Sequence, residues 1–565
     1  MTTEVPDQHG ATPQSPFPMP PDFPVKWENP DEEKLFWEPD RMHFPEQITP
    51  MMVGWGRAFR EGFKRASQTL ALPIRLQHGR FNTYNYSAMV PTVSPEEMEA
   101  QGKRAQEKVG AAMSRLWEAW DAEFLPEVKG YLADWDAFDL PGASMPALLA
   151  HLEQTWARLT RLWDIHFVAV LPAILAPSIF NDMYEDLFGK KGAFDALRLT
   201  QGFGNKTVEG GHALWELSRK ALASSAVQKV LEENGPHDVP AALEASDEGR
   251  AFLKELAAYL EEFGQRSDVF AELGNPGWIE NPTTAIINLK NFITQPDRDL
   301  RAELAALADE RERHVAEARE RLKGYPQAVR DQFEFFLKTS QSAAVVQEDH
   351  NYWIDQMAQY KVRLVLLEFG RRLAGAGVIE HPNDVFYLMP DELNEAAAAL
   401  PDGDRRQLVA DRKAEMEHFR TIQPPPAIGT PPPGPPPDNP LIRAIGRFSG
   451  TPPQPSTDPN IVHGNPGSPG KATGTAKVVL TLADAGKVQP GDILVAPSTM
   501  PAWTPLFASI AAVVTDAGGI LSHAAIVARE YNIPAVLGTG KATSAIKDGQ
   551  TVEVDGDAGV VRIVS

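Results

Sequence analysis

The sequence predicts a mostly α-helical body followed by a C-terminal α/β domain. From about residue 94 to about residue 400, apolar residues recur at helical spacings of three and four. Prolines are concentrated in residues 423–463, and short β-branched runs bounded by Gly, Pro and Asp follow them. These observations divide the chain into a disordered Pro-rich tail (1–24), a mainly helical domain (25–422), a flexible Pro-rich linker (423–463) and the α/β domain (464–565).

The composition is that of a multidomain globular protein with an acidic surface. A chain of 565 residues predicts two or three domains, and a hydrophobic fraction of 43% is ordinary for such proteins. The chain has no cysteine, so disulfides, thiol catalysis and zinc–thiolate sites are excluded, which fits a cytoplasmic protein. Its net charge of -22 disfavours nucleic acid and anionic lipid as partners. We find no apolar run that predicts a membrane span and no signal-peptide pattern.

The helical domain is expected to begin with a small β element. Residues 76–86 read as strands around a turn. Ser94, Pro95 and Glu97 then form the pattern of a capped helix start. Further along, an apolar stripe from Leu152 to Val170 predicts a buried helix, in which His166 is expected to be a core histidine.

The linker has two interpretations. Proline lacks a backbone donor and favours extended, semi-stiff chain, and three groups of prolines lie within residues 424–437. Such a segment is either a passive spacer or a tether for a domain that moves. The composition of the linker alone does not separate the two.

The α/β domain contains the segment that carries chemistry. Residues 515–530 read TDAGGILSHAAIVARE, in which a strand ends in two glycines and His523 follows at the start of a helix. Gly518 and Gly519 let backbone N–H groups approach a bound group, and a helix N-terminus suits phosphate. A neutral imidazole there can attack phosphorus and later release it. A histidine that only caps or packs is the alternative.

This segment closely resembles the phosphohistidine motif of the phosphoenolpyruvate-utilising enzymes. The resemblance covers roughly residues 464–565, including GDILV at 491–495, PAWTP at 501–505 and NIPAVLG at 532–538. It implies a swivelling domain in which His523 carries a phosphoryl group. Many family members have Thr where this chain has Leu521, whereas Ser522 keeps a hydroxyl for the phosphoryl oxygens or for capping the helix.

The resemblance also implies a donor held by another protein. Family members charge their histidine from ATP on an ATP-grasp domain or from phosphoenolpyruvate on a barrel. We identify neither a barrel after the motif nor a Gly-rich nucleotide loop before it. We therefore expect ATP and Mg²⁺ on a partner subunit that resembles the N-terminal part of phosphoenolpyruvate synthase. This chain would itself bind no cofactor or metal.

Several segments of the helical domain carry a further pattern: HFPEQITP at 43–50, residues 202–217, GQRS at 264–267 followed by PGWIE at 276–280, and GVIE at 377–380 with DVFYL at 384–388. Through them the domain bears a weaker resemblance to the acceptor domains of rifampicin phosphotransferase and phenylphosphate synthase. Its best candidate for an acceptor site is residues 348–355, EDHNYWID. His350 is the predicted general base, and Glu348 or Asp349 would orient it. On an α-helix Glu348 and Asp355 would share one face. An exposed acidic helix start is the alternative. Arg266 would neutralise the phosphoryl group or form a structural ion pair.

These inferences predict a two-component, ATP-dependent phosphotransferase. His523 would pass the phosphoryl group to a small hydroxylated acceptor, and we expect a phenol or alkylphenol because the split architecture resembles phenylphosphate synthase. Phosphorylation of an antibiotic, as by rifampicin phosphotransferase, or of another small alcohol is the alternative with the same chemistry. A non-catalytic regulatory protein with a phosphorylatable histidine domain is the alternative of another class.

Overall fold

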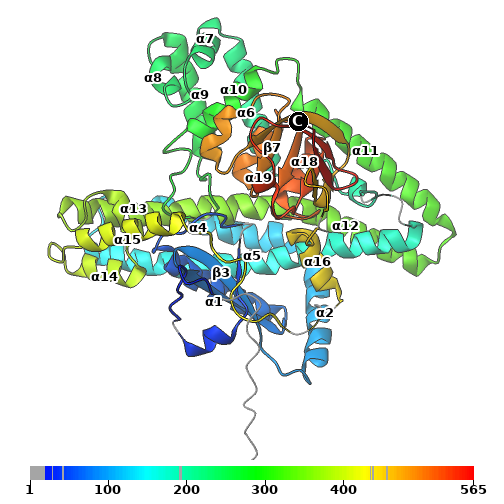
Figure 1. Ribbon diagram of the computed structural model, residues 1–565, viewed down its shortest axis with the longest axis horizontal. Coiled ribbons are helices and arrows are strands. Elements are labelled where there is room, and N and C mark those ends of the chain that lie inside the picture. Colours follow the sequence, from blue (N-terminus) through cyan, green and yellow to red (C-terminus); the bar gives the residue numbers. More distant parts are fainter. Residues whose placement is uncertain are drawn as a thin grey trace, which may run out of the picture.

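The computed structural model describes residues 19–27, 29–40, 43–189, 192, 194–270, 272–432, 434, 438–453 and 456–564. These residues form a helical body and a C-terminal α/β domain that lies against it (Figure 1). The predicted fold class is therefore confirmed. The helices of the body are α1 (Met52–Thr69), α2 (Met98–Ser114), α3 (Leu116–Ala119), α4 (Leu125–Ala137), α5 (Met145–Phe188), α6 (Lys206–Leu222), α7 (Ser225–Glu233), α8 (Val239–Leu243), α9 (Asp247–Phe263), α10 (Thr283–Ile293), α11 (Leu300–Arg321), α12 (Gln327–His350), α13 (Gln359–Gly375), α14 (Pro390–Ala398) and α15 (Arg406–Arg420).

A small antiparallel sheet precedes most of these helices, as predicted. It has the order β1-β3-β2, with β1 (Glu38–Pro39), β2 (Ile74–Phe81) and β3 (Tyr84–Pro91). Asn82 and Thr83 form the β2–β3 turn with positive φ. The next helix begins later than its capping pattern indicated. Residues 95–97 form a turn in which the Ser94 N–H donates to Glu97, and α2 starts at Met98.

The predicted disordered tail extends too far. Residues 1–18 lie outside the described part of the chain, but Phe23 is fully buried. Its ring packs against Tyr84, Tyr86 and Phe419. An apolar ring removed from water stabilises the chain around it. Ordered structure therefore reaches into the segment predicted to be disordered.

The body is organised around α5, a helix of 44 residues that packs against α1 and α12 (Figure 1). Ser144 caps its start by accepting a hydrogen bond from the Ala147 N–H. By length and composition alone α5 could cross a membrane, although no such segment was predicted from the sequence. Of its most apolar stretch, 67% is buried within the protein, as in the central helix of a helical bundle.

The helix after α12 does not keep the α-helical repeat. Asn351–Ala358 (η5) is a π-helix, and α13 continues from it without a break. The wider turn of a π-helix changes which side chains share a face, and such segments are frequent at functional sites. Residues 350 and 355, five apart, consequently lie together.

The C-terminal domain is built on an eight-stranded mixed sheet of order β4-β11-β10-β6-β7-β8-β9-β5. Strands β6 to β9 are parallel neighbours and the others pair antiparallel. The strands are β4 (Ile461–His463), β5 (Asn465–Ser468), β6 (Lys471–Val478), β7 (Ile493–Ala496), β8 (Ala512–Thr515), β9 (Ala535–Leu537), β10 (Thr551–Asp555) and β11 (Val560–Ile563). Three helices accompany them: α17 (Thr504–Phe507), α18 (His523–Glu530) and α19 (Ala542–Ala545).

The linker is more structured than predicted. Ile428 is buried and exchanges two backbone hydrogen bonds with Trp37. Helix α16 (Pro440–Ser449) lies in the middle of the linker and packs against α5. Asn439 caps α16, and Arg447 pairs with Asp182 of α5. A fully flexible linker over residues 423–463 is therefore a wrong prediction, since parts of it are fixed to the body.

The two domains share one hydrophobic core. Trp503, Leu506 and Phe507 of the α/β domain are buried in the same cluster as Phe263 and Tyr352 of the body. The structure thus shows the C-terminal domain docked on the body, with the N-terminus of α18 facing α12.

Candidate functional site

His523 is the first residue of α18, at the edge of the sheet that faces the body. Its Nε2 atom lies 3.2 Å from the hydroxyl of Thr504, and its Nδ1 atom lies 3.3 Å from Oε1 of Glu348 on α12. A carboxylate only accepts hydrogen bonds, so Nδ1 carries the proton in this contact. Nε2 is then the nitrogen with the free electron pair.

Two buried hydroxyls without a partner line the same cavity as the histidine. Among the described residues no group forms a hydrogen bond with Ser522 Oγ or Thr499 Oγ1, and both side chains are at most 5% exposed. A buried hydroxyl without a partner is costly, and a bound group with oxygen atoms would satisfy it. Ser522 occupies the N-cap position of α18, yet its side chain does not cap the helix. Its hydroxyl is therefore available to a ligand.

The two glycines have different structural roles. Gly518 has φ of +105°, which disfavours any other residue. A Cβ atom on Gly519 would lie 2.3 Å from the carbonyl oxygen of Arg447. The Gly519 N–H donates to the Phe448 carbonyl at the end of α16, so this amide is already used. Gly519 thus brings the loop close to α16 instead of opening its amide to a phosphate.

Glu348 is almost completely buried where the two domains meet. Burial alone would raise the pKa of its carboxyl, but the His523 ring holds that pKa below its ordinary value. The carboxylate is therefore ionised and faces the imidazole ring of His523. An exposed acidic helix start, the alternative interpretation of this segment, is excluded by this burial.

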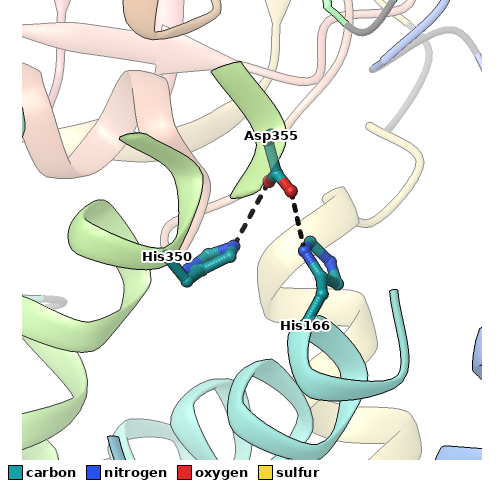
Figure 2. A group of neighbouring side chains, drawn as sticks. All are labelled: His166, His350 and Asp355. Atoms are coloured by element: carbon teal, nitrogen blue, oxygen red, sulfur yellow. Dashed lines mark hydrogen bonds and ion pairs between the residues drawn. The ribbon is translucent and has the colours of Figure 1, made fainter. Parts of the chain in front are cut away.

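Figure 2 shows that the side chains of His166, His350 and Asp355 form a cluster. All three line the same cavity as His523. Asp355 Oδ1 lies 2.9 Å from His166 Nδ1, and Oδ2 lies 3.4 Å from His350 Nε2. Burial would raise the pKa of Asp355, yet the two rings hold that pKa well below its usual range. Burial is the largest influence on both histidines and acts to lower their pKa. The pKa of His166 is lowered. For His350, in contrast, Asp355, the Val346 carbonyl and Glu348 together raise the pKa above its ordinary value.

A cavity of about 200 Å³ connects His523 to this cluster. One wall is apolar and includes Phe167, Val170, Leu171 and Ile174 of α5. His43 also lines the cavity. This space is more than ten times what one water molecule requires, so it has room for an organic molecule. A molecule held there would lie between the histidine–aspartate cluster and His523 of the α/β domain.

Two other predicted site residues lie outside the cavity. Asp349 accepts a hydrogen bond from the Lys206 N–H at the start of α6. The guanidinium of Arg266 lies 4.0 Å from the ring centre of Trp278, and it donates to the Tyr259 hydroxyl. Arg266 lines a neighbouring hollow that also contacts Asp355. These positions give Asp349 and Arg266 structural partners, whereas Glu348, His350, Ser522 and His523 come together.

Two segments of the chain are similar to known protein families. Residues 488–559 match the mobile domain of the PEP-utilising enzymes. The C-terminal α/β domain therefore belongs to the family of PEP-utilising mobile domains. Residues 166–348 match the fourth domain of rifampicin phosphotransferase. His166 thus begins one matched region and His523 lies in the other.

Three relatives of this chain are longer proteins. The chain is 42% identical to a chondramide synthase of Chondromyces crocatus over 97% of this chain and 14% of that protein. It is 33% identical to an uncharacterised phosphotransferase, YvkC, of Bacillus subtilis (71% of this chain, 47% of that protein). A rifampicin phosphotransferase of Streptomyces sviceus is 30% identical (71% and 44%). The chain thus spans less than half the length of each.

The sequence patterns did not reveal the roles of Thr499, Thr504, His166 and Asp355. Thr504 begins α17 and lies in the PAWTP stretch that the resemblance already covered, so a chemical interpretation of that stretch would have found it. His166 was assigned to the core because it lies on an apolar stripe. Asp355 was assigned to the face of Glu348, because an α-helix was assumed where the structure has a π-helix.

Proposed function

We propose that this chain relays a phosphoryl group from His523 to a hydroxyl group of a small molecule bound in the cavity. The observation that carries the proposal is that His523 opens onto the same cavity as a buried cluster of two histidines and an aspartate. The match to the mobile domain of the PEP-utilising enzymes supports it.

The geometry supports a defined role for each group. The phosphoryl group resides on Nε2 of His523, while Glu348 keeps a proton on Nδ1. A protonated ring is the better leaving group, because the N–P electron pair returns to a nitrogen of a cationic imidazole. Ser522 and Thr499 donate hydrogen bonds to the phosphoryl oxygens. As the N–P bond to His523 breaks, the acceptor oxygen forms the new bond to phosphorus, and its proton passes to the cluster of His166, His350 and Asp355.

We propose a phenol or alkylphenol as the acceptor. The apolar wall along α5 and the ring of Phe270 suit a planar apolar molecule that presents one hydroxyl to the cluster. A rifampicin-like antibiotic or another small alcohol is equally compatible with the family, and the relative from Streptomyces sviceus favours the antibiotic. A transfer assay with acceptors of all three classes distinguishes them.

We propose that ATP and Mg²⁺ are bound by a separate ATP-grasp partner. The relatives that match over most of this chain are much longer than it is, so they contain further segments. In the test, the purified chain is mixed with ATP, Mg²⁺ and phenols, with and without an ATP-grasp protein that is encoded by a neighbouring gene. AMP formation only in the mixture supports a partner, whereas AMP formation by the chain alone contradicts it.

The relay itself is tested without any partner. Phosphoramidate, a small donor that phosphorylates histidine, charges the wild-type chain, and phenols, rifampicin and simple alcohols are then added in turn. We expect an acid-labile phosphoenzyme that disappears as one class of phosphate ester forms. A phosphoenzyme that transfers its group to none of these acceptors would instead favour the regulatory alternative.

A further inference from the structure

We propose that His166, His350 and Asp355 bind a divalent transition-metal ion beside the phosphoryl group. Their donor atoms lie within 4.8 Å of one another, and they come from α5, the end of α12 and η5 (Figure 2). Ligands about 2.1 Å from a tetrahedral ion lie roughly 3.4 Å from each other. Asp355 Oδ1 lies 2.9 Å from His166 Nδ1, and Asp355 Oδ2 lies 3.4 Å from His350 Nε2. Both distances are close to that value.

The orientation of His350 is that of a metal ligand. Its Nδ1 atom lies 2.9 Å from the carbonyl oxygen of Val346, so Nδ1 carries the hydrogen. In a neutral ring the electron pair of Nε2 then points at an oxygen of Asp355, which also carries electron pairs. Only a proton or a cation between the two makes this contact favourable. Metal-binding histidines usually donate their other N–H to a backbone carbonyl in this way.

The carboxylate is also held in place. Asn351 donates to Asp355 Oδ2 from one side, and His166 contacts Oδ1 from the other. The side chain of Asp355 is only 2% exposed, and a buried anion needs compensating positive charge. An ion shared with two neutral rings would provide that charge.

The described residues that line the cavity include histidines but no permanently positive side chain for a phosphoryl group. Among these described residues there is no lysine or arginine. The glutamate that faces His523 adds a negative charge instead. A phosphoryl group that enters this space therefore meets two carboxylates, and a divalent ion at the cluster would neutralise them.

The donor set indicates the kind of ion. Two imidazole nitrogens and one carboxylate oxygen suit zinc, iron or cobalt better than magnesium, which prefers oxygen ligands. Three protein ligands leave a position free, as in catalytic sites. That position would face the cavity, where a hydroxyl oxygen could bind. With the ion bound, the hydroxyl proton would leave to water instead of to the cluster. This role in the transfer rests on the proposed function, whereas the binding of the ion does not.

The test measures binding to the full-length chain without any phosphoryl donor. Protein stripped of metal with a chelator is titrated with Co²⁺, which reports its coordination by visible absorption, and with Zn²⁺ and Mg²⁺ by calorimetry. We expect one Co²⁺ or Zn²⁺ per chain and binding of Mg²⁺ at least about 100-fold weaker. Asp355→Asn and His350→Gln, which preserve volume, should each weaken Zn²⁺ binding by about 100-fold or more.

Two further variants show whether the ion binds at this cluster or elsewhere on the chain. His314 lies between Glu310 and Glu317 on α11, and His314→Ala should leave Zn²⁺ affinity unchanged. His523→Ala should also bind Zn²⁺ normally, even though it cannot relay phosphate. Zn²⁺ should raise the Tm of the wild type but not of Asp355→Asn, which also shows whether that variant folds. Binding that survives Asp355→Asn and His350→Gln, or no stoichiometric binding in the wild type, would overturn the proposal.

Discussion

The two halves of the site are built in different ways. The phosphocarrier half comes from one short stretch, residues 518–523, together with Thr504 of the same domain. The acceptor half joins His166 of α5 to Asp355 of η5, which are 189 residues apart. A loop held by its own backbone tolerates changes in distant packing, whereas the acceptor half depends on how α5 and α12 pack. Substitutions in the two halves should therefore have separable effects.

The largest effect is expected at the phosphocarrier. His523→Ala removes the nucleophile, so labelling by phosphoramidate should fall to background while acceptor binding changes less than about threefold. The measurement is acid-labile, base-stable phosphoenzyme. His463→Ala, a change in the same domain on β4, is the control and should be labelled normally. Undiminished labelling of His523→Ala would contradict the assignment of His523 as the phosphocarrier.

Glu348 connects the two halves, and its loss should affect only one step. Glu348→Gln removes the charge that holds the proton on His523 Nδ1, so transfer from the phosphoenzyme to the acceptor should slow by about 100-fold. Labelling by phosphoramidate should change little. Asp349→Asn is the matched control, because the neighbouring carboxylate contacts α6 instead. Equal slowing by both substitutions would indicate a general disturbance of α12.

Glu530 should make docking of the two domains depend on pH. It lies on α18, accepts the Gly202 N–H of the body, and is faced by Arg311, Arg529 and Glu348. Burial is the main cause that raises its pKa from 4.5 to about 7. The protonated form is therefore favoured in the docked state. The contribution to docking is complete below pH 4.5 and is lost as the pH rises through about 7.

The size of this effect follows from the two pKa values. The docking constant should be roughly 50- to 100-fold larger at pH 5 than at pH 8. Fluorescence energy transfer between dyes on the two domains measures it. Glu530→Gln keeps an oxygen for the Gly202 N–H and should remove most of the dependence. A wild-type protein whose docking is constant over this range would contradict the assignment.

The smallest expected effect concerns the anchor of α16. Arg447 pairs with Asp182 and donates to Ser178 on α5, and this pair is partly exposed. A double-mutant cycle with Arg447→Ala and Asp182→Ala should give a coupling of about 0.5–1 kcal/mol in the free energy of unfolding. The measurement is urea denaturation. No coupling would mean that the Arg447–Asp182 pair does not help to hold α16 on the body.

Local patterns predicted the phosphocarrier half well. The strand, the glycine turn and the helix that starts near His523 are contiguous, and β8 and α18 lie where the sequence placed them. The helical body and the β2–β3 turn were also predictable, because period and turn chemistry are local signals. The start of α16 had a signal that was overlooked, since Asn439 followed by Pro440 is the pattern of a capped helix.

The acceptor half could not be predicted in the same way. An α-helical repeat places Asp355 beside Glu348, and only the π-helix brings it to His350. The partner of His166 is set by the packing of α5 against the α12–η5 helix, which sequence spacing does not encode. A histidine on an apolar stripe therefore gave no signal of its role.

The contact between α16 and the phosphocarrier loop makes the movement of the domain measurable at single amides. The N–H groups of Gly519 and Leu521 donate to the carbonyls of Phe448 and Arg447, which stay with the body through α16. When the domain departs, both amides lose these acceptors and exchange their hydrogens with water. Where redocking is faster than exchange, their exchange rate relative to the free rate equals the fraction of time that the domain spends away. Two amide signals would thus record what fraction of the time His523 spends away from the acceptor, without any label on the protein.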